Sequence, residues 1–324
     1  MKYEIRQAAA NDVQPALDLA QLVFTESEAL LNEPGAIESF KMRIANRENI
    51  RNYETQKFLM FIAIDNEKII GMTCGYGNDR ILVYVDGRYH RQGIATKLTE
   101  RIVCGLKLRG VNRITAEVSP CGMPFFSSFG FHPDGIEQKS DGIIFTPMFY
   151  KPGEIWDVLD ENGNKTGRYA ERGRKMASGD YHLVVCVWKR NSRGEWLIDK
   201  RAPRGMDIDG KWETTGGCAI AGDDSLAAAL RETREELGIE LDPDKGTLYQ
   251  HKACRADDGH TWFNDIWVFE TECPLEAIRF QKEETCDARW VTADKILEMM
   301  ASGEFPNEEK YYPSFSEMAE KWKV

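Results

Sequence analysis

The chain has 324 residues, with 42 lysines and arginines against 53 aspartates and glutamates, and so a formal net charge of −11. This length suggests two domains, and the acidity argues against nucleic acid as a partner, because phosphate backbones attract basic surfaces. The sequence shows no apolar run long enough to cross a membrane and no signal-peptide core, and its eight cysteines are scattered without a C-x-x-C pair. We therefore expect a cytoplasmic protein with no membrane partner and no disulfide framework.

The charge also differs between the two halves of the chain. Residues 1–150 carry 17 basic and 18 acidic side chains, a net charge of −1, whereas residues 151–324 carry 25 and 35, a net charge of −10. Between the halves, Pro152-Gly153 is a dipeptide of the kind that marks a loop. We therefore expect one domain over residues 1–150 and a second over residues 151–324, both with α and β structure.

Periodicity and turn residues predict the elements of the first half. They are a strand at Lys2–Arg6, helical stretches at Ala9–Phe24 and Ala36–Lys57, strands at Phe58–Asp65, Lys68–Tyr76 and Ile81–Asp86, and a helix from Thr96 to about Arg109. The last strand reaches the last helix through the glycine-bearing loop Gly87–Ala95. Free N–H groups and the helix dipole at such a helix start favour a phosphate, although many strand-to-helix turns use glycine without binding one.

The loop resembles motif A of the GCN5-related N-acetyltransferases (GNAT), written Gln/Arg-x-x-Gly-x-Gly/Ala. Gly93 and Ala95 fit the motif, while His90 departs from its first position. A strand at Arg113–Ser119, a short helix ending in Gly130-Phe131 and a strand at Asp141–Met148 continue the resemblance. It implies a domain with a mixed sheet and helices that takes acetyl-CoA as cosubstrate. It also implies that the pyrophosphate of acetyl-CoA is held by Val85, Arg91, Gln92, Gly93, Ile94, Ala95 and Thr96.

The transfer chemistry of this domain is less defined. The family often places a tyrosine in the short helix to protonate the leaving thiolate, and the matching residue here is Phe126, which has no proton to give. Ser119, Cys121 and Tyr89 are alternatives, and nothing in the sequence selects one of them. The domain is therefore expected to be an acyl-CoA-dependent N-acyltransferase or, alternatively, a non-catalytic acyl-CoA-binding module.

The second half reads as strands around one strongly predicted helix. The strands are Ile155–Leu159, Tyr181–Lys189, Glu195–Arg201, Thr247–Ala256, Thr261–Glu270 and Ala288–Thr292, and a closing helix is expected at Thr292–Ser302. The central helix follows Gly217. Asp224 and Ser225 are good N-cap residues, and Gly238 stands where a glycine ends a helix.

Three carboxylates share one face of this central helix. Glu232, Glu235 and Glu236 stand at i, i+3 and i+4, so their side chains lie close together. Such a group is either a solvated acidic face, paired with Arg231 and Arg234, or a site for a hard divalent cation, which takes oxygen ligands.

The stretch resembles the Nudix box, Gly-x5-Glu-x7-Arg-Glu-U-x-Glu-Glu-x-Gly-U, where U is a bulky aliphatic residue. The positions that match are Gly217, Arg231, Glu232, Glu235, Glu236, Gly238 and Ile239, while Asp223 and Thr233 depart from the pattern. The resemblance implies an α/β/α sandwich with Mg²⁺ or Mn²⁺ held by Glu232, Glu235 and Glu236. It also implies a catalytic group of Arg231, Glu232 and Glu235, with a general base that is either a box glutamate or an acid from a later loop. Glu284, beside Glu283, is our candidate for the later acid, and a solvated loop is the alternative for this pair.

The upstream part of this domain, from Asp157 to the hairpin after Tyr181-His182, is similar to Nudix proteins related to isopentenyl diphosphate isomerase. The isomerase's catalytic cysteine falls at Gly216 and one of its histidine ligands at Cys218. We therefore expect hydrolysis of a diphosphate bond in a small nucleoside-diphosphate-X-type substrate, with an isomerase as the less favoured alternative. The sequence thus predicts a bifunctional two-domain α/β enzyme.

Overall fold

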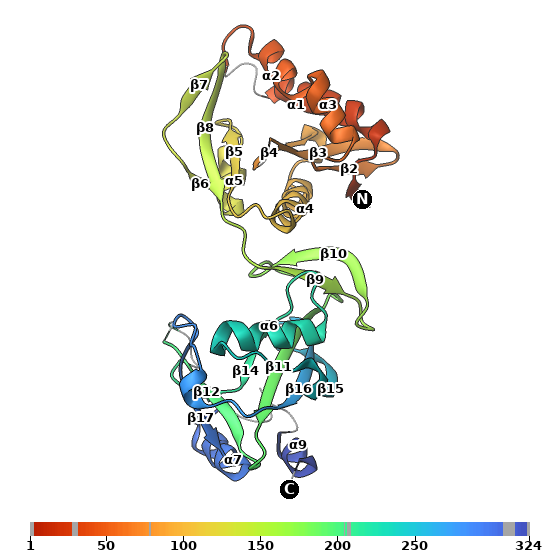
Figure 1. Cartoon of the computed structure of the whole chain (residues 1–324). Coiled ribbons are helices and arrows are strands. Elements are labelled where there is room, and N and C mark those ends of the chain that lie inside the picture. Colours follow the sequence, from red (N-terminus) through yellow and green to blue (C-terminus); the bar gives the residue numbers. More distant parts are fainter. Residues whose placement is uncertain are drawn as a thin grey trace. The chain divides into compact units, whose positions relative to one another are not determined.

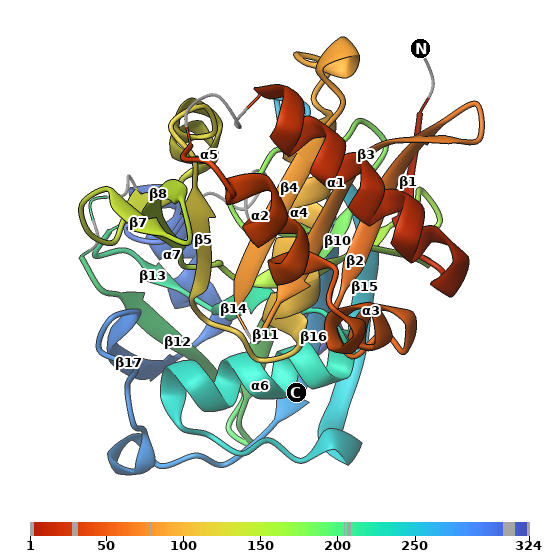
Figure 2. The same ribbon diagram turned by 90° about the horizontal axis from the view of Figure 1, so that it is seen from above.

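A computed structural model describes residues 3–27, 32–77, 79–203, 205, 209–306 and 315–322. The contacts divide the chain into two compact units, and Figures 1 and 2 show their elements. The first unit is Met1–Ile155 with Tyr169–Gly173, and the second is Trp156–Arg168 with Arg174–Val324. Each unit contains a mixed sheet with helices, which confirms the predicted fold class.

The sheet of the first unit runs in the order β1-β2-β3-β4-β5-β8-β6, with β7 paired to β8. Its strands are β1 (Glu4–Gln7), β2 (Met60–Asp65), β3 (Lys68–Tyr76), β4 (Arg80–Val85), β5 (Ile114–Val118), β6 (His132–Pro133), β7 (Gln138–Ser140) and β8 (Ile143–Tyr150). The predicted strand at Lys2–Arg6 begins at a residue outside the described part. Strands β4 and β5 run parallel and pair at Arg80↔Thr115, whereas the other strands pair antiparallel.

Helices cover both faces of this sheet (Figure 1). They are η1 (Ala10–Asp12), α1 (Val13–Ser27), α2 (Ala36–Ile44), α3 (Arg47–Glu54), η3 (Gly87–Tyr89), α4 (Ile94–Leu108) and α5 (Met123–Phe129). Helices α1, α2 and α3 bury Phe24, Phe40 and Tyr53 in one core cluster, while α4 buries Leu98 and Ile102 in clusters on the other face. The helical stretch predicted at Ala36–Lys57 is two helices, because Asn46 is an N-cap whose side chain accepts from Asn49 N.

A two-stranded sheet, β10-β9, has residues in both units. The sheet of the second unit runs in the order β13-β12-β11-β16-β15, with β14 paired to β11 and β17 to β12. The strands are β9 (Ile155–Leu159), β10 (Lys165–Glu171), β11 (His182–Arg190), β12 (Trp196–Arg201), β13 (Trp212–Glu213), β14 (Thr215–Cys218), β15 (Gly246–Arg255), β16 (Thr261–Glu270) and β17 (Thr285–Val291). In this sheet β11 and β16 run parallel.

Helix α6 (Ser225–Leu237) packs on one face of the larger sheet, and α7 (Ala293–Ser302) and α9 (Phe315–Lys321) pack on the other (Figure 1). Two short 3-10 turns, η4 (Pro243–Lys245) and η5 (Leu275–Ala277), complete this unit. The sequence patterns missed the short strands β6, β7, β13 and β14, and they also missed β10 and α9, since β10 is polar and α9 is only two turns long. No helix in the described part of the chain is long and apolar enough to cross a bilayer.

Candidate active sites

The loop before α4 has the backbone form of an anion site. Arg91 and Gly93 have φ values of 63° and 78°, in the left-handed region, and Gly93 is the N-cap residue of α4. The N–H groups of a helix's first turn have no partner within the helix and point outward. A Cβ at Gly93 would meet nothing within 4 Å, so the space beside this residue is open. The loop brings together the predicted residues from Arg91 to Thr96, and its start is fixed by His90 Nε2, 3.0 Å from the Val85 carbonyl.

Phe126 lies in the core of α5 rather than in an open site. Its side chain is buried and packs edge-on against Phe125 and Phe131. Tyr89 and Cys121, two of the alternative proton donors, each contact a different part of this unit. Tyr89 donates to Asp65 across 3.2 Å, while Cys121 Sγ lies 3.7 Å from the Ser27 carbonyl.

A small pocket that the sequence did not reveal lies between α1, α2 and the strands β3, β4, β5 and β8. Aromatic rings form its wall, and Glu117 is held there between two arginines, 2.8 Å from Arg43 Nη1 and 2.7 Å from Arg80 Nη1. Its lining is Phe24, Phe40, Arg43, Ile44, Tyr76, Arg80, Leu82, Tyr84, Glu117, Ser119, Ile143, Ile144 and Phe145. A charged residue in an alternating strand such as β5 was the available signal, but nothing in the sequence shows which arginines meet it.

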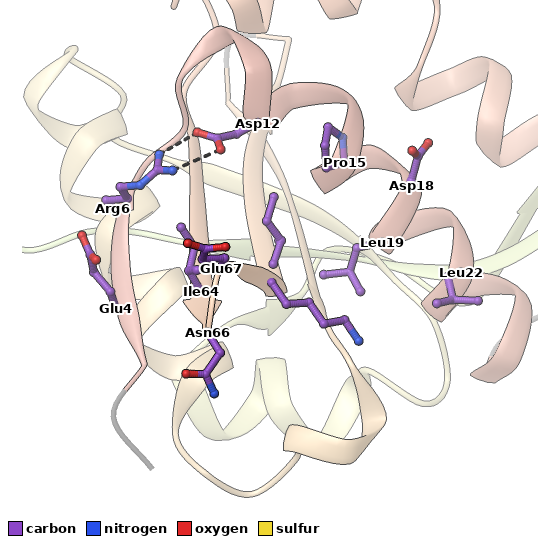
Figure 3. A pocket seen from close by; sticks show the side chains of 12 residues that line it. Glu4, Arg6, Asp12, Pro15, Asp18, Leu19, Leu22, Ile64, Asn66 and Glu67 are labelled. Carbon is purple, nitrogen blue, oxygen red and sulfur yellow. Dashed lines mark hydrogen bonds and ion pairs between the residues drawn. The ribbon is translucent and has the colours of Figure 1, made fainter.

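A larger hollow of about 930 Å³ lies beside β1, α1 and the β2–β3 turn (Figure 3). Its polar lining is mainly acidic, and Arg6 forms a two-pronged ion pair with Asp12, with distances of 2.6 and 3.1 Å. None of the predicted site residues lines it. We therefore assign the chemistry of this unit elsewhere.

In the second unit, α6 begins and ends as its sequence predicts. The Asp224 carboxylate accepts from Ala227 N at 2.8 Å, and Gly238 ends the helix with a φ of 68°. Thr233, which departs from the box pattern, is fully buried, so it still packs in the core. The loop before the helix is held by Asp157, which accepts from Gly222 N at 2.9 Å.

Arg231 is the centre of the carboxylate group. Its Nε donates to Asp223, and its Nη1 donates to Glu232 and Glu235, at 2.9, 2.9 and 3.0 Å. Burial acts to lower the pKa of Arg231, but the bond to Asp223 and the charge of Glu232 raise it above its ordinary value. Asp223 therefore fulfils a pairing role although it is one methylene shorter than the glutamate of the pattern.

Glu236 differs from these acids. Within the described residues its side chain has no hydrogen bond or ion pair, and it is only 8% exposed. Burial, reinforced by the charges of Asp199, Glu232 and Glu213, raises the pKa of Glu236 well above its usual range. A mostly buried carboxylate in an acidic neighbourhood is the group that an added cation would stabilise.

These residues fit a divalent cation, provided that side chains move. Among the described residues, no three acidic, histidine or cysteine side chains are arranged to hold a metal, because Arg231 draws Glu232 and Glu235 toward itself. The space for Glu232 is nevertheless built in: a Cβ on Gly217 would lie 2.3 Å from the Glu232 carboxyl group. A cation at Glu236 would need Glu232 and Glu235 to turn from Arg231.

The later loop that carries Glu284 is attached to the end of α6. Gln281 N donates to the Glu236 carbonyl at 3.0 Å, and Arg279 N donates to the Leu237 carbonyl at 2.7 Å. Glu284 itself is anchored through its backbone, since its carbonyl accepts from Ala202 N at 2.8 Å. The fold thus brings the loop of the predicted base to the helix of the predicted ligands.

Comparison with known proteins identifies both units. A model of the acetyltransferase (GNAT) domain matches residues 24–152, and a model of the NUDIX domain matches residues 180–315. An uncharacterized Nudix hydrolase of Listeria monocytogenes is 38% identical over 153 residues, which cover 47% of this chain and 88% of the relative. An isopentenyl-diphosphate Delta-isomerase of Streptomyces avermitilis is 30% identical over 155 residues, 47% of this chain and 77% of the relative.

Among solved structures, a PaiA N-acetyltransferase of Thermoplasma acidophilum in complex with coenzyme A matches 47% of this chain and 99% of its own, with 20% identity and a TM-score of 0.39. The matches to curated proteins and domain models define a hydrolase domain preceded by a transferase domain. The chain belongs to the Nudix hydrolase family and carries an acetyltransferase (GNAT) domain in its first half.

Proposed function

We propose that the second unit hydrolyses a diphosphate bond in a nucleoside-diphosphate-X-type substrate with the help of Mg²⁺ or Mn²⁺. The observation that carries the proposal is Glu236, a mostly buried carboxylate without a side-chain partner among the described residues, one turn from Glu232 on α6. A bound divalent cation neutralises the diphosphate and lowers the pKa of a bound water. Glu232, Glu235 and Glu236 would hold this cation.

The remaining steps belong to this chain's own residues. Arg231 holds Glu232 in place by ion pairing until a cation binds. Arg231 then stays bound to Asp223 and to the Cys218 carbonyl, at 2.9 and 3.0 Å. Glu284 takes the proton of the attacking water, since its loop is anchored to the end of α6. A positioned base of this kind contributes a rate factor of roughly 10²–10⁴.

Hydrolysis is favoured over isomerisation by the backbone at Gly216. A Cβ there would lie 2.6 Å from the Val185 carbonyl oxygen, a distance that real Cβ atoms do not adopt. A cysteine, the acid that the isomerase reading needs at this position, therefore does not fit without moving strand β14. The glutamate set of α6 is complete without it.

The test is Glu236→Gln in the full chain, with Glu240→Gln, an exposed acid beyond the helix, as the control. We expect Glu236→Gln to abolish hydrolysis and to leave the fold intact, because the amide is nearly the same size and removes a repelled charge. Hydrolysis is measured against nucleotide sugars, dinucleotides, CoA and prenyl diphosphates. If the Glu236→Gln protein is still active, Glu236 is not a metal ligand and the acidic face of α6 is only a solvated surface.

We propose further that the first unit binds an acyl-CoA at the Arg91–Thr96 loop and transfers its acyl group to an amine. Val85, Arg91, Gln92, Gly93, Ile94, Ala95 and Thr96 are the proposed pyrophosphate residues. The small pocket around Glu117 lies beside strands β4 and β5, and it is the place we propose for the acceptor amine. Because Phe126 is a core residue, transfer is expected to be slow, and the alternative of a binding module without transfer stays open.

Calorimetry with acetyl-CoA tests the binding step. We expect the natural chain to bind and Gly93→Glu to lose binding, because the new carboxylate faces the pyrophosphate. Gly110→Glu is a matched control: Gly110 lies just beyond the other end of α4, has a φ of 86° and also faces open space. If acetyl-CoA fails to bind the natural chain, the acyl-CoA proposal is wrong.

A further inference from the structure

A lysine is completely buried beneath the carboxylate helix. Lys189 on β11 and Asp199 on β12 both have no exposed surface, and Lys189 Nζ lies 3.7 Å from Asp199 Oδ2. Thr215 Oγ1 joins them, because it accepts from Lys189 Nζ and donates to Asp199 Oδ2 at 2.9 Å. Burial of a lysine away from water is unfavourable unless a charge compensates it, so this group calls for a physical reason.

The sheet register places the three side chains under α6. Lys189 pairs with Leu197, Thr215 with Val187, and Asp199 with Glu213. Leu197 and Val187 belong to the core cluster that includes Ala228 and Ala229 of α6. Since paired residues point to the same face of a sheet, the Lys189–Thr215–Asp199 group lies on the side that α6 covers.

Each neighbouring acid has a basic partner. Glu213 pairs with Arg201 at 2.8 Å, Glu232 pairs with Arg231, and Asp199 pairs with Lys189. Burial lowers the pKa of Lys189, and Asp199 and then Glu236 are the charges that most oppose this. Glu236 is thus the carboxylate that would attract the ammonium next if Asp199 were absent.

We propose that Lys189 and Asp199 are positioning residues of the Nudix site. Asp199, through Thr215, holds the ammonium on the sheet so that Glu236 does not pair with it and stays available to a divalent cation. The inference rests on the proposed role of Glu236 in metal binding. The opposite charges of Lys189 and Asp199 balance each other, and this keeps the ammonium away from Glu236. Neither residue contacts the substrate.

The experiment measures Mn²⁺ binding to the full chain without substrate, by calorimetry, for Asp199→Asn, Lys189→Met and the double variant. We expect Asp199→Asn to weaken Mn²⁺ binding at least about tenfold, because the freed ammonium turns to Glu236. The double variant should return to within about threefold of the natural chain, a non-additive result expected of coupled residues. Asp180→Asn, which breaks the ion pair with Arg168 in the same unit, is the control and should leave Mn²⁺ binding unchanged.

Folding of every variant is followed by tryptophan fluorescence. If Asp199→Asn does not fold, Thr215→Val loosens the same contact without a change of charge and should weaken Mn²⁺ binding about threefold or more. Unchanged Mn²⁺ binding in the folded variant, or a double variant as weak as Asp199→Asn, would overturn the inference alone. A Glu236→Gln protein with normal Mn²⁺ binding would overturn both the inference and the proposed metal site.

Discussion

At the scale of single residues, this site depends on an absent side chain. Gly217 on β14 leaves the space that the Glu232 carboxyl group fills, because a Cβ there would lie 2.3 Å from its carbon atom. The obstacle is the end of a flexible side chain, so the glutamate can turn away without disturbing the strand. The box glycine is therefore needed for the position of Glu232 rather than for a special backbone angle.

We accordingly predict that Gly217→Ala lowers the rate of diphosphate hydrolysis about 10²-fold, the scale of loss of a positioned catalytic group, with little loss of stability. Gly87→Ala, at a glycine with no neighbour within 4 Å, is the control and should behave as the natural chain. Rates and tryptophan-detected unfolding are measured together. Full activity in Gly217→Ala would show that hydrolysis does not need the space beside Gly217 that the Glu232 carboxyl group fills.

Asp86 is a second residue whose charge the fold exploits, just before the anion loop. Its carboxylate accepts from Arg88 N at 3.1 Å and from Arg88 Nε at 2.9 Å, and the bond to the Arg88 side chain holds the pKa of Asp86 well below its usual range. The folded state therefore favours the ionised form. The stability from this group is present above the unfolded pKa, about 3.9, and is lost as pH falls through the lower folded value.

Asp86→Asn should thus destabilise the first unit by about 1 kcal/mol at pH 7, the usual effect of a lost cap, with a smaller difference at pH 3 than at pH 7. Far-UV circular dichroism during urea titration at several pH values measures this. Asp134→Asn removes the partner of an exposed pair with Arg113, which contributes little, and is the control. A difference that grows on acidification would contradict the assigned direction of the pKa.

At the scale of elements, residues at both ends of α6 fix where this helix begins and where it ends. Asp224 caps its start, and Gly238 ends it where a Cβ would lie 2.8 Å from the Arg279 Cβ. The same end holds the loop of Glu284 through the Glu236 and Leu237 carbonyls. Helix length and loop position are therefore one structural unit.

Loss of the cap in Asp224→Ala should destabilise the second unit by about 1 kcal/mol and leave acetyl-CoA binding unchanged. Tryptophan fluorescence is a selective probe, because all eight tryptophans lie at or after Trp156. Glu240→Ala, just past the helix, serves as the comparison variant. Equal urea midpoints for the two proteins would mean that the cap is dispensable.

At the scale of the whole molecule, the boundary between the two compact units is not a single position in the chain. The second compact unit begins at Trp156, yet Tyr169–Gly173 is grouped with the first. Within that first group, Glu171 accepts from the Tyr150 hydroxyl and from Gly153 N at 2.9 and 2.6 Å. A fragment that begins just after residue 150, or at residue 153, therefore lacks Tyr150, which is a partner of the buried Glu171 carboxylate.

We predict that a fragment starting at Gly153 folds and hydrolyses diphosphates, but unfolds at a lower urea concentration than the second unit of the full chain. The lost Tyr150 contact is worth about 1 kcal/mol. Glu171→Gln in the fragment should recover part of this difference, since the amide is easier to bury without that donor. An unfolded fragment, judged by its tryptophan emission, would show that the units do not fold independently.

The sequence alone was sufficient for the α6 helix, its caps and its acidic face, because these depend on residues within one or two turns of each other. It also located most strands and the loop that begins α4, where alternation and glycine act locally. The same local logic identified both family resemblances. Asp223 and Thr233, the two departures, proved to keep a pairing role and a buried role.

Only the tertiary structure decided which charges meet. Lys189, Asp199 and Thr215 lie on three different strands and come together through strand pairing. Arg43, Arg80 and Glu117 in the first unit are far apart along the chain and also meet only in the fold. A buried lysine within a β pattern looks in sequence like an exposed one. The physical reason is that burial and Coulomb interactions depend on distance in space, and a sheet sets that distance by register between strands that no local pattern specifies.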